Sequence, residues 1–168
     1  STYAVHQPLK ALRKIPNVFR VMSTYLASET TEVYQAASQC LISILSDSIQ
    51  DHLLLFTPDV DDKIFKNVDD IICQISKTFI DFLSIKYSHC SREILKILVA
   101  AFNKFRYRSN PHFLKSLKIV DTWRVNEEQF MDLRNEIELV IGASISAMGP
   151  EVVLAQAPLN LDLSLIHI

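Results

Sequence analysis

Glycine is almost absent from this chain, since Gly142 and Gly149 are the only two among its 168 residues. Tight turns rely on glycine because it tolerates positive φ angles, and phosphate-binding loops need several closely spaced glycines. A β-sandwich or a Rossmann-type sheet is therefore a poor candidate. Hydrophobic residues make up 49% of the chain and charged residues 21%, which excludes a disordered chain. Long helices joined by short links are the favoured architecture.

Apolar residues recur along nearly the whole chain at the three- and four-residue spacing of amphipathic helices. We expect Pro16 to break or kink the first helix, because proline removes a backbone donor from a helix interior. No run of about 18 uninterrupted apolar residues occurs, so no membrane-spanning helix is expected. The pattern predicts helices over about 9–27, 28–55, 62–87, 91–105, 111–120 and 126–148, with a further helix starting at 150.

Residues that favour helix ends lie near these boundaries. Asp61-Asp62 can cap the helix that follows, and Asn110 is expected to cap a helix with Pro111 in its first turn. Asn126 and Gln129 have the spacing of a capping box, in which each side chain bonds the backbone of the other.

Gly149-Pro150 is expected to end one helix and to start the next, because glycine tolerates a left-handed end and proline suits a first helical position. We also expect this glycine to avoid a side-chain clash there. Gly149→Leu should therefore damage the fold.

Helical pairs of this length would recur about every 35 to 45 residues, which is the period of HEAT and armadillo repeats. The sequence predicts an all-α, HEAT/armadillo-like α-solenoid of antiparallel helix pairs over residues 1–168, and an irregular helical bundle is the alternative. The chain opens Ser1-Thr2-Tyr3 without a methionine, so we expect a segment of a larger protein. Apolar residues alternate with polar ones over 159–166, which is compatible with a last helix, an extended tail or an expression scar.

Sequence motifs of enzymes are missing. With two glycines, no dinucleotide-binding loop, P-loop or nucleophile elbow can be written, and no His-Glu-x-x-His motif occurs. No catalytic residue, cofactor or metal is therefore expected.

The three cysteines are an odd number at wide spacing, which indicates buried thiols in a reducing compartment. Cys40 and Cys73 lie on apolar stripes and are expected to be small core residues. A metal site from Cys73, His89 and Cys90 would lack a fourth ligand with conventional spacing. A catalytic Cys90 would need a base and a lowered pKa.

Positive charge is concentrated in one part of a chain whose net charge is only −2. Between residues 92 and 124, eight basic residues face two acids, and the balance becomes acidic after 126. A basic strip beside aromatic residues can bind phosphates or an acidic protein, whereas the alternative is a solvated surface paired with the acidic neighbouring helix. The candidate contact face for RNA or a protein partner is Arg92, Lys96, Lys104, Arg106 and Arg108, followed by Lys115 and Lys118.

Specific runs in the second half resemble a known family. The most specific lies within 141–154 and reads Met148-Gly149-Pro150-Glu151-Val152-Val153-Leu154, followed by Pro158-Leu159-Asn160-Leu161. Residues 82–87, 94–98 and 110–114 follow the same pattern. Over about 73–162 the chain resembles the central conserved domain of the ribosomal RNA-processing protein twelve family, large eukaryotic HEAT-repeat proteins.

This resemblance implies a non-catalytic scaffold in small ribosomal subunit biogenesis, acting in pre-rRNA processing, 90S and pre-40S maturation and nuclear export. It implies localisation to the nucleolus and nucleus, with shuttling to the cytoplasm on pre-40S particles. The implied partners are preribosomal proteins and assembly factors, pre-rRNA and the nuclear transport machinery, with no membrane. The alternative is a transport-receptor-like solenoid that binds a peptide cargo or a small GTPase.

Overall fold

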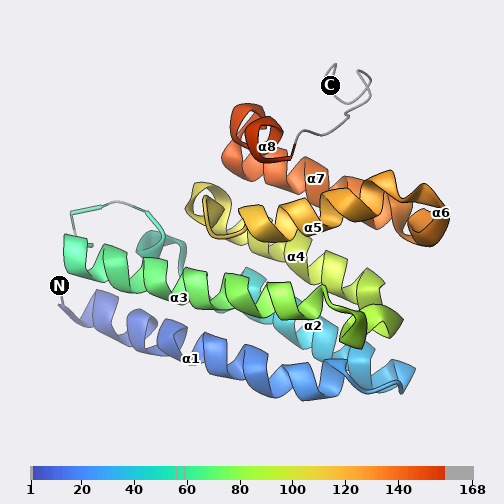
Figure 1. Ribbon diagram of the computed structural model, residues 1–168. Helices are drawn as coiled ribbons and strands as arrows, with labels where there is room; N and C mark the ends of the chain where they lie inside the picture. The colour runs from blue at the N-terminus through green and yellow to red at the C-terminus, as the bar shows by residue number, and fades with distance from the viewer. Residues whose placement is uncertain (1, 56, 59, 158–168) are drawn as a thin grey trace.

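The computed structural model describes residues 2–55, 57–58 and 60–157 (Figure 1). Across these ranges the chain forms helices and no strand, which confirms the predicted all-α class. None of the helices in them is long and apolar enough to cross a membrane. The alternating segment 159–166 lies outside the described residues.

Within the described residues, six long helices carry the fold, and short helical segments connect them. The long helices are α1 (Thr2–Leu26), α2 (Thr31–Asp47), α3 (Asp62–Phe82), α4 (Ser91–Phe105), α5 (Leu114–Val125) and α7 (Arg134–Met148). The connecting segments are η1 (Asp51–Leu53), η2 (Ile85–Cys90), η3 (Arg106–Ser109), α6 (Glu127–Phe130) and η4 (Met131–Leu133), and the short helix α8 (Pro150–Gln156) follows α7.

The long helices form three stacked pairs, α1 with α2, α3 with α4, and α5 with α7 (Figure 1). Helix α3 packs between α1 and α5 in one layer, and α4 packs between α2 and α7 in the other. Helix α8 covers the end of the third pair, against α7 and α5. This arrangement is the predicted solenoid of antiparallel helix pairs.

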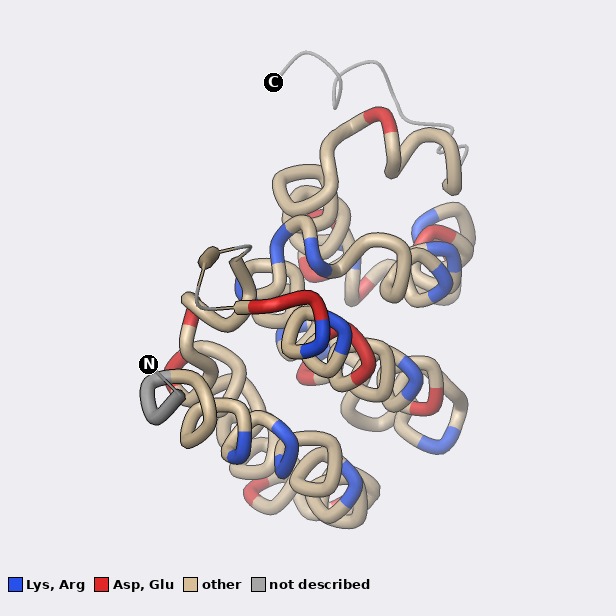
Figure 2. The backbone as a smooth tube through the Cα atoms, turned by 90° about the vertical axis from the view of Figure 1, so that its left-hand side faces the viewer, with Lys and Arg blue, Asp and Glu red and all other residues tan. Residues whose placement is uncertain are grey.

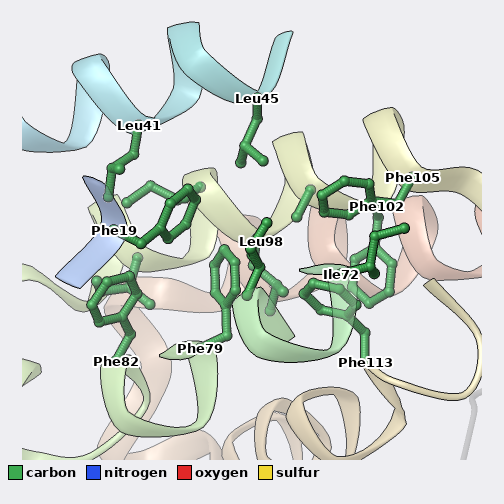
Figure 3. Close-up of a cluster of buried hydrophobic side chains, with 14 of the residues drawn as sticks. Phe19, Leu41, Leu45, Ile72, Phe79, Phe82, Leu98, Phe102, Phe105 and Phe113 are labelled. Carbon is green, nitrogen blue, oxygen red and sulfur yellow. The ribbon is translucent and has the colours of Figure 1, made fainter. Parts of the chain in front are cut away.

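Buried aromatic rings join the pairs to one another (Figure 3). The Phe79 ring lies 5.9 Å from that of Phe19 on α1 and 5.5 Å from that of Phe113, which precedes α5. The Phe113 ring also lies 5.6 Å and 5.9 Å from those of Phe102 and Phe105 on α4. All five side chains are at most 1% exposed. Each such ring buries a large apolar area, so this cluster is a main source of cohesion between pairs.

Pro16 does not break the first helix, contrary to one of the two outcomes expected for it. Helix α1 begins well before residue 9 and continues through both Pro8 and Pro16 to Leu26. On either side of Pro16, the side chains of Ile15 and Phe19 are buried in the core. The free energy of that burial offsets the cost of a proline in a helix interior, about 3 kcal/mol.

The second and third helices end earlier than predicted, because the apolar pattern continues after the helix has stopped. Helix α2 ends at Asp47 rather than near 55, yet Ile49, Leu53 and Leu54 are buried. Helix α3 ends at Phe82 rather than near 87, and the buried residue Tyr87 belongs to η2. Connecting segments that fill the core therefore carry the same apolar spacing as the helices.

Three predicted caps have different outcomes. The Asp61 side chain accepts a hydrogen bond of 2.8 Å from the Ile64 backbone N–H, which confirms its capping role. Asn110 does not cap a helix, because α5 begins only at Leu114. The Asn110-Pro111 peptide bond is cis. Phe113, which directly precedes α5, is buried in the core and fixes the position of the start of the helix.

The prediction of a capping box at Asn126 and Gln129 is also wrong. The Asn126 Nδ2 donates to the Gln129 Oε1 at 2.9 Å, and neither side chain bonds the helix backbone as a box requires. The helix expected over 126–148 is instead divided into α6, η4 and α7. The bend allows the Phe130 ring to stack on Trp123, with centroids 4.9 Å apart and planes 7° apart.

Gly149 ends α7 and Pro150 begins α8, as predicted. The backbone at Gly149 has φ 90° and ψ 151°, a region open almost only to glycine. The expected side-chain clash is wrong, because a Cβ built on Gly149 has no heavy atom within 4 Å. Backbone strain alone therefore requires glycine at this position.

The two glycines provide a matched test of this explanation. Gly149→Ala should destabilise the fold by about 1–3 kcal/mol through strain at positive φ. Gly142→Ala, within α7 and equally free of neighbours, should stabilise it by about 0.5–1 kcal/mol because alanine loses less backbone entropy in a helix. Thermal unfolding should thus shift in opposite directions, and equal shifts would contradict the strain argument.

Candidate functional site

Arg92, at the start of α4, contacts the acidic helix beside it. Its Nη2 donates to the Asp132 carbonyl oxygen at 2.9 Å, and its Nε lies 3.7 Å from the Glu136 Oε1 on α7. Arg92 therefore makes the contact expected of a surface paired with the neighbouring acidic helix, and it ties the second helix pair to the third.

Lys104, near the end of α4, is engaged in a different connection. Its Nζ lies 2.9 Å from the Asp51 Oδ1 in η1, and its side chain is only 11% exposed. The hydrogen bond from Lys104, together with its charge, lowers the pKa of the Asp51 carboxyl. Lys104 thus anchors the link between α2 and α3 onto α4.

Arg108 is the most deeply engaged of the predicted contact residues. Its guanidinium donates to the Leu54 carbonyl oxygen at 3.0 Å and to the Phe65 carbonyl oxygen at 3.1 Å. The same group lies 3.7 Å from the centroid of the Phe65 ring, at cation–π distance. Burial lowers the pKa of Arg108, although an arginine stays protonated at physiological pH. This side chain joins η3 to the start of α3.

The other four predicted residues, Lys96, Arg106, Lys115 and Lys118, are exposed, but they lie in different places. Lys96 is on the outer side of α4, in the layer of α2 and α7. Lys115 and Lys118 are on the outer side of α5, in the layer of α1 and α3, and Arg106 lies at the junction of α4 and η3. The structure does not bring the seven residues together on one surface.

Helix α1 carries a basic surface that the charge count over 92–124 did not include. It contains Lys10, Arg13, Lys14 and Arg20 and no acidic residue, and these positions are blue along α1 in Figure 2. All four side chains are exposed. A count of charges by predicted helix, in place of a window, would have found them.

A groove of about 580 Å³, lined mainly by residues with polar side chains, lies between α1 and α3 and includes two of these cations. Its charged lining consists of Arg13 and Arg20 from α1 and Lys77 and Asp81 from α3. The remaining lining residues are Pro16, Asn17, Ser23, Gln74 and Thr78. We call this feature the α1–α3 groove.

His89 and Cys90 have a structural role at the end of α1. The His89 Nε2 lies 2.8 Å from the Leu26 carbonyl oxygen, and the Cys90 Sγ lies 3.3 Å from the same oxygen. A carbonyl oxygen only accepts, so the imidazole Nε2 and the thiol both donate. Burial raises the pKa of the Cys90 thiol to about 12, with Glu93 acting in the same direction. This shift is opposite to the one that a catalytic thiolate requires.

The expected burial of the other two cysteines is wrong. Cys40 is exposed on α2 and Cys73 is half-buried on α3, whereas Cys90 is fully buried. The apolar stripe of α2 is wider than the part of the helix that the core covers. Cys40 lies at the edge of this stripe, at the surface between α1 and α2, and is therefore exposed. Among the residues that the structure describes, no three His, Cys, Asp or Glu side chains are grouped to hold a metal ion.

Comparison with known proteins gives a family match over most of the chain. The family model described as "Ribosomal RNA-processing protein 12, HEAT repeats" matches residues 27–166, and so begins upstream of the segment 73–162 that carries the resemblance. The chain is 87% identical over 162 residues to Ribosomal RNA-processing protein 12 of Saccharomyces cerevisiae, covering 96% of this chain and 13% of that protein.

More distant relatives match with similar coverage. The chain is 26% identical over 146 residues to the Putative ribosomal RNA-processing protein 12 of Schizosaccharomyces pombe, covering 87% of this chain and 11% of that protein. It is 25% identical over 154 residues to the human RRP12-like protein, covering 90% of this chain and 11% of that protein. The chain thus spans only a small part of the curated relatives that it matches. No solved structure matches it significantly.

The structural role of Arg108 predicts a contrast with its neighbour Arg106. Arg108→Ala should lower the free energy of unfolding by about 1–3 kcal/mol, because two carbonyl oxygens lose a charged donor. Arg106→Ala removes an exposed side chain and should change it by less than about 0.5 kcal/mol. Chemical denaturation of the two variants measures the difference, and equal stabilities would show that the Arg108 contacts contribute nothing.

The three cysteines should differ in reactivity towards a thiol reagent at pH 8. We expect Cys40 to react fastest, Cys73 more slowly, and Cys90 only after unfolding, because its thiol is buried and un-ionised. The pKa of Cys90 is raised on folding, so its stabilising contribution is complete below the unfolded pKa near 9.0 and is lost as the pH rises towards about 12. Mass spectrometry of the labelled native protein measures the order, and early labelling of Cys90 would contradict it.

Proposed function

The chain belongs to the ribosomal RNA-processing protein 12 family of HEAT-repeat proteins, and on this premise we propose that it is a non-catalytic scaffold segment in small ribosomal subunit biogenesis. In this role it acts in the nucleolus and nucleus, during pre-rRNA processing and the maturation of 90S and pre-40S particles. It travels with these particles as they are exported. Its partners are preribosomal proteins and assembly factors, pre-rRNA and the nuclear transport machinery.

The identity of 87% to the S. cerevisiae protein is the observation that carries this proposal. That relative is named for ribosomal RNA processing. Such similarity over 96% of this chain supports a role for this chain in the same process. The architecture supports binding as the mechanism. Stacked helix pairs bury their core between neighbours and leave two long outer surfaces for partners.

The chemistry of the described residues also supports binding in place of turnover. His89 and Cys90 donate to the backbone at the end of α1, and the raised thiol pKa opposes nucleophilic catalysis. Among the predicted contact residues that remain exposed are Lys96 on α4, Arg106 at the junction of α4 and η3, and Lys115 and Lys118 on α5. We therefore assign contact with partners to these four residues and a structural role to Arg92, Lys104 and Arg108.

Crosslinking of the chain in a yeast nuclear extract tests the proposal. Scaffolding in the small subunit pathway predicts crosslinks to small-subunit rRNA precursors and to preribosomal proteins, identified by sequencing and mass spectrometry. Crosslinks to a small GTPase or a transport cargo in their place would support a transport-receptor-like solenoid and would contradict the proposal.

Two charge-reversed variants identify the surface used. Lys96→Glu with Arg106→Glu changes α4 and its junction with η3, and Lys115→Glu with Lys118→Glu changes α5 by the same charge. We expect at least one variant to lose association with preribosomal particles severalfold, because exposed charges steer such encounters. Both should melt like the unmodified chain. Full association by both variants would exclude these four residues as contacts.

A further inference from the structure

The cations of the α1–α3 groove differ from Arg92 and Lys104 in having no internal ion pair within the described residues. In the part of the chain that the structure describes, salt bridges engage Arg92 and Lys104 but none of Arg13, Arg20 and Lys77. The hydrogen bond from the Arg20 guanidinium to the Asn17 side chain stays within the groove. The positive charge of these three side chains is therefore available to an external anion.

The charges of the groove favour a polyanion. Three cations and the single carboxylate of Asp81 leave it with a net charge of +2. Lys10 and Lys14 add positive charge on the exposed side of the same helix.

The uncharged lining favours a nucleic-acid backbone over a protein. Asn17, Ser23, Gln74 and Thr78 supply amide and hydroxyl groups. Arginine, lysine, serine, threonine, asparagine and glutamine are the side chains that contact phosphate and sugar oxygens. The centre of a protein interface is usually rich in aromatic residues, and Pro16 is the only residue of this lining without a polar side chain.

The spacing of the cations suits an extended ligand. Arg13 and Arg20 are seven residues apart on α1, or about 10.5 Å at the rise of an α-helix, and Lys77 faces them from α3. A ligand in contact with all three must follow the groove for about two helical turns. A polymer with repeated negative charges meets this requirement, whereas a single phosphate does not.

We propose that the α1–α3 groove binds the phosphate backbone of an RNA strand through Arg13, Arg20 and Lys77. This assignment rests on the proposed function, which places the chain beside rRNA precursors. It adds an RNA contact on α1 and α3 to the partner contacts assigned to the exposed residues of the segment 92–124. Because the contacts are to phosphates, binding is independent of base sequence and weakens as salt is added.

Fluorescence anisotropy with a labelled 20-nucleotide oligouridylate tests the site on the whole chain. The variant Arg13→Glu, Arg20→Glu, Lys77→Glu should bind about ten- to a hundredfold more weakly at 0.1 M salt. The slope of log K against log salt should fall by about 2, since each phosphate contact on a single strand contributes about 0.7. A neutral variant, with glutamine at the same three positions, should show the same change in slope.

The matched control is Lys63→Glu, Lys86→Glu, Arg134→Glu, at three exposed residues outside the groove, which changes the net charge equally elsewhere. Circular dichroism checks that each variant is folded, and the glutamine variant replaces any that is not. Loss of binding in the groove variants alone supports the site. Loss in the control alone, equal loss in both, or no binding of RNA by the unmodified chain overturns it.

Two further binding measurements identify the class of ligand that the groove prefers. An oligoadenylate should bind as oligouridylate does, whereas strong base preference would contradict backbone recognition. Efficient competition by a polyglutamate peptide of equal charge would identify an acidic protein segment as the ligand and would overturn the RNA assignment.

The outcomes for the groove and for the proposed function can be distinguished. If the groove variant keeps its RNA affinity while the unmodified chain still crosslinks to preribosomal proteins, the groove proposal fails and the proposed function stands. If RNA affinity is lost but no such crosslinks form, the proposed function fails and the groove stands.

Discussion

Burial of aromatic rings between helix pairs is the interaction on which the rest of the structure depends. Phe79 and Phe113 lie at its centre, since their rings contact each other and reach Phe19 on α1 and Phe102 on α4. Rings from three pairs therefore share one core (Figure 3). Helix α1 includes Pro8 and Pro16, and some links between helices are not regular α-helix; both persist because they present apolar side chains to that core.

The spacing of apolar residues is enough to predict the fold class and most helices, since burial of one helical face is a local property of the sequence. Helix ends are harder to predict, as residues 48–55 and 83–90 show. Ile49, Leu53 and Tyr87 are buried from non-α-helical segments, so the pattern continues across the boundary. The positive φ at Gly149 was predictable, because glycine followed by proline is a strong local signal.

The candidate site was less predictable, because whether a cation is free depends on contacts between distant parts of the chain. Arg108 bonds Leu54 and Phe65, which are 54 and 43 residues away, and Lys104 pairs with Asp51. Charge density in the sequence cannot distinguish such structural cations from exposed ones. The fold therefore separates two uses of positive charge: some cations fasten the helix pairs together, and others on α1, α3 and α5 face outward, where a large assembly can contact them.

Native-state hydrogen exchange of the variant Phe113→Leu tests most directly whether the aromatic cluster unites the helix pairs. The substitution removes ring contacts to α3 and α4 at a cost of roughly 1–3 kcal/mol. If the cluster couples the pairs, the slowest-exchanging amides of α1, α3, α4, α5 and α7 should all lose protection by the same free energy. Loss of protection confined to α5 and α7, with α1–α4 unchanged, would show that the pairs are independent units and would contradict a shared core.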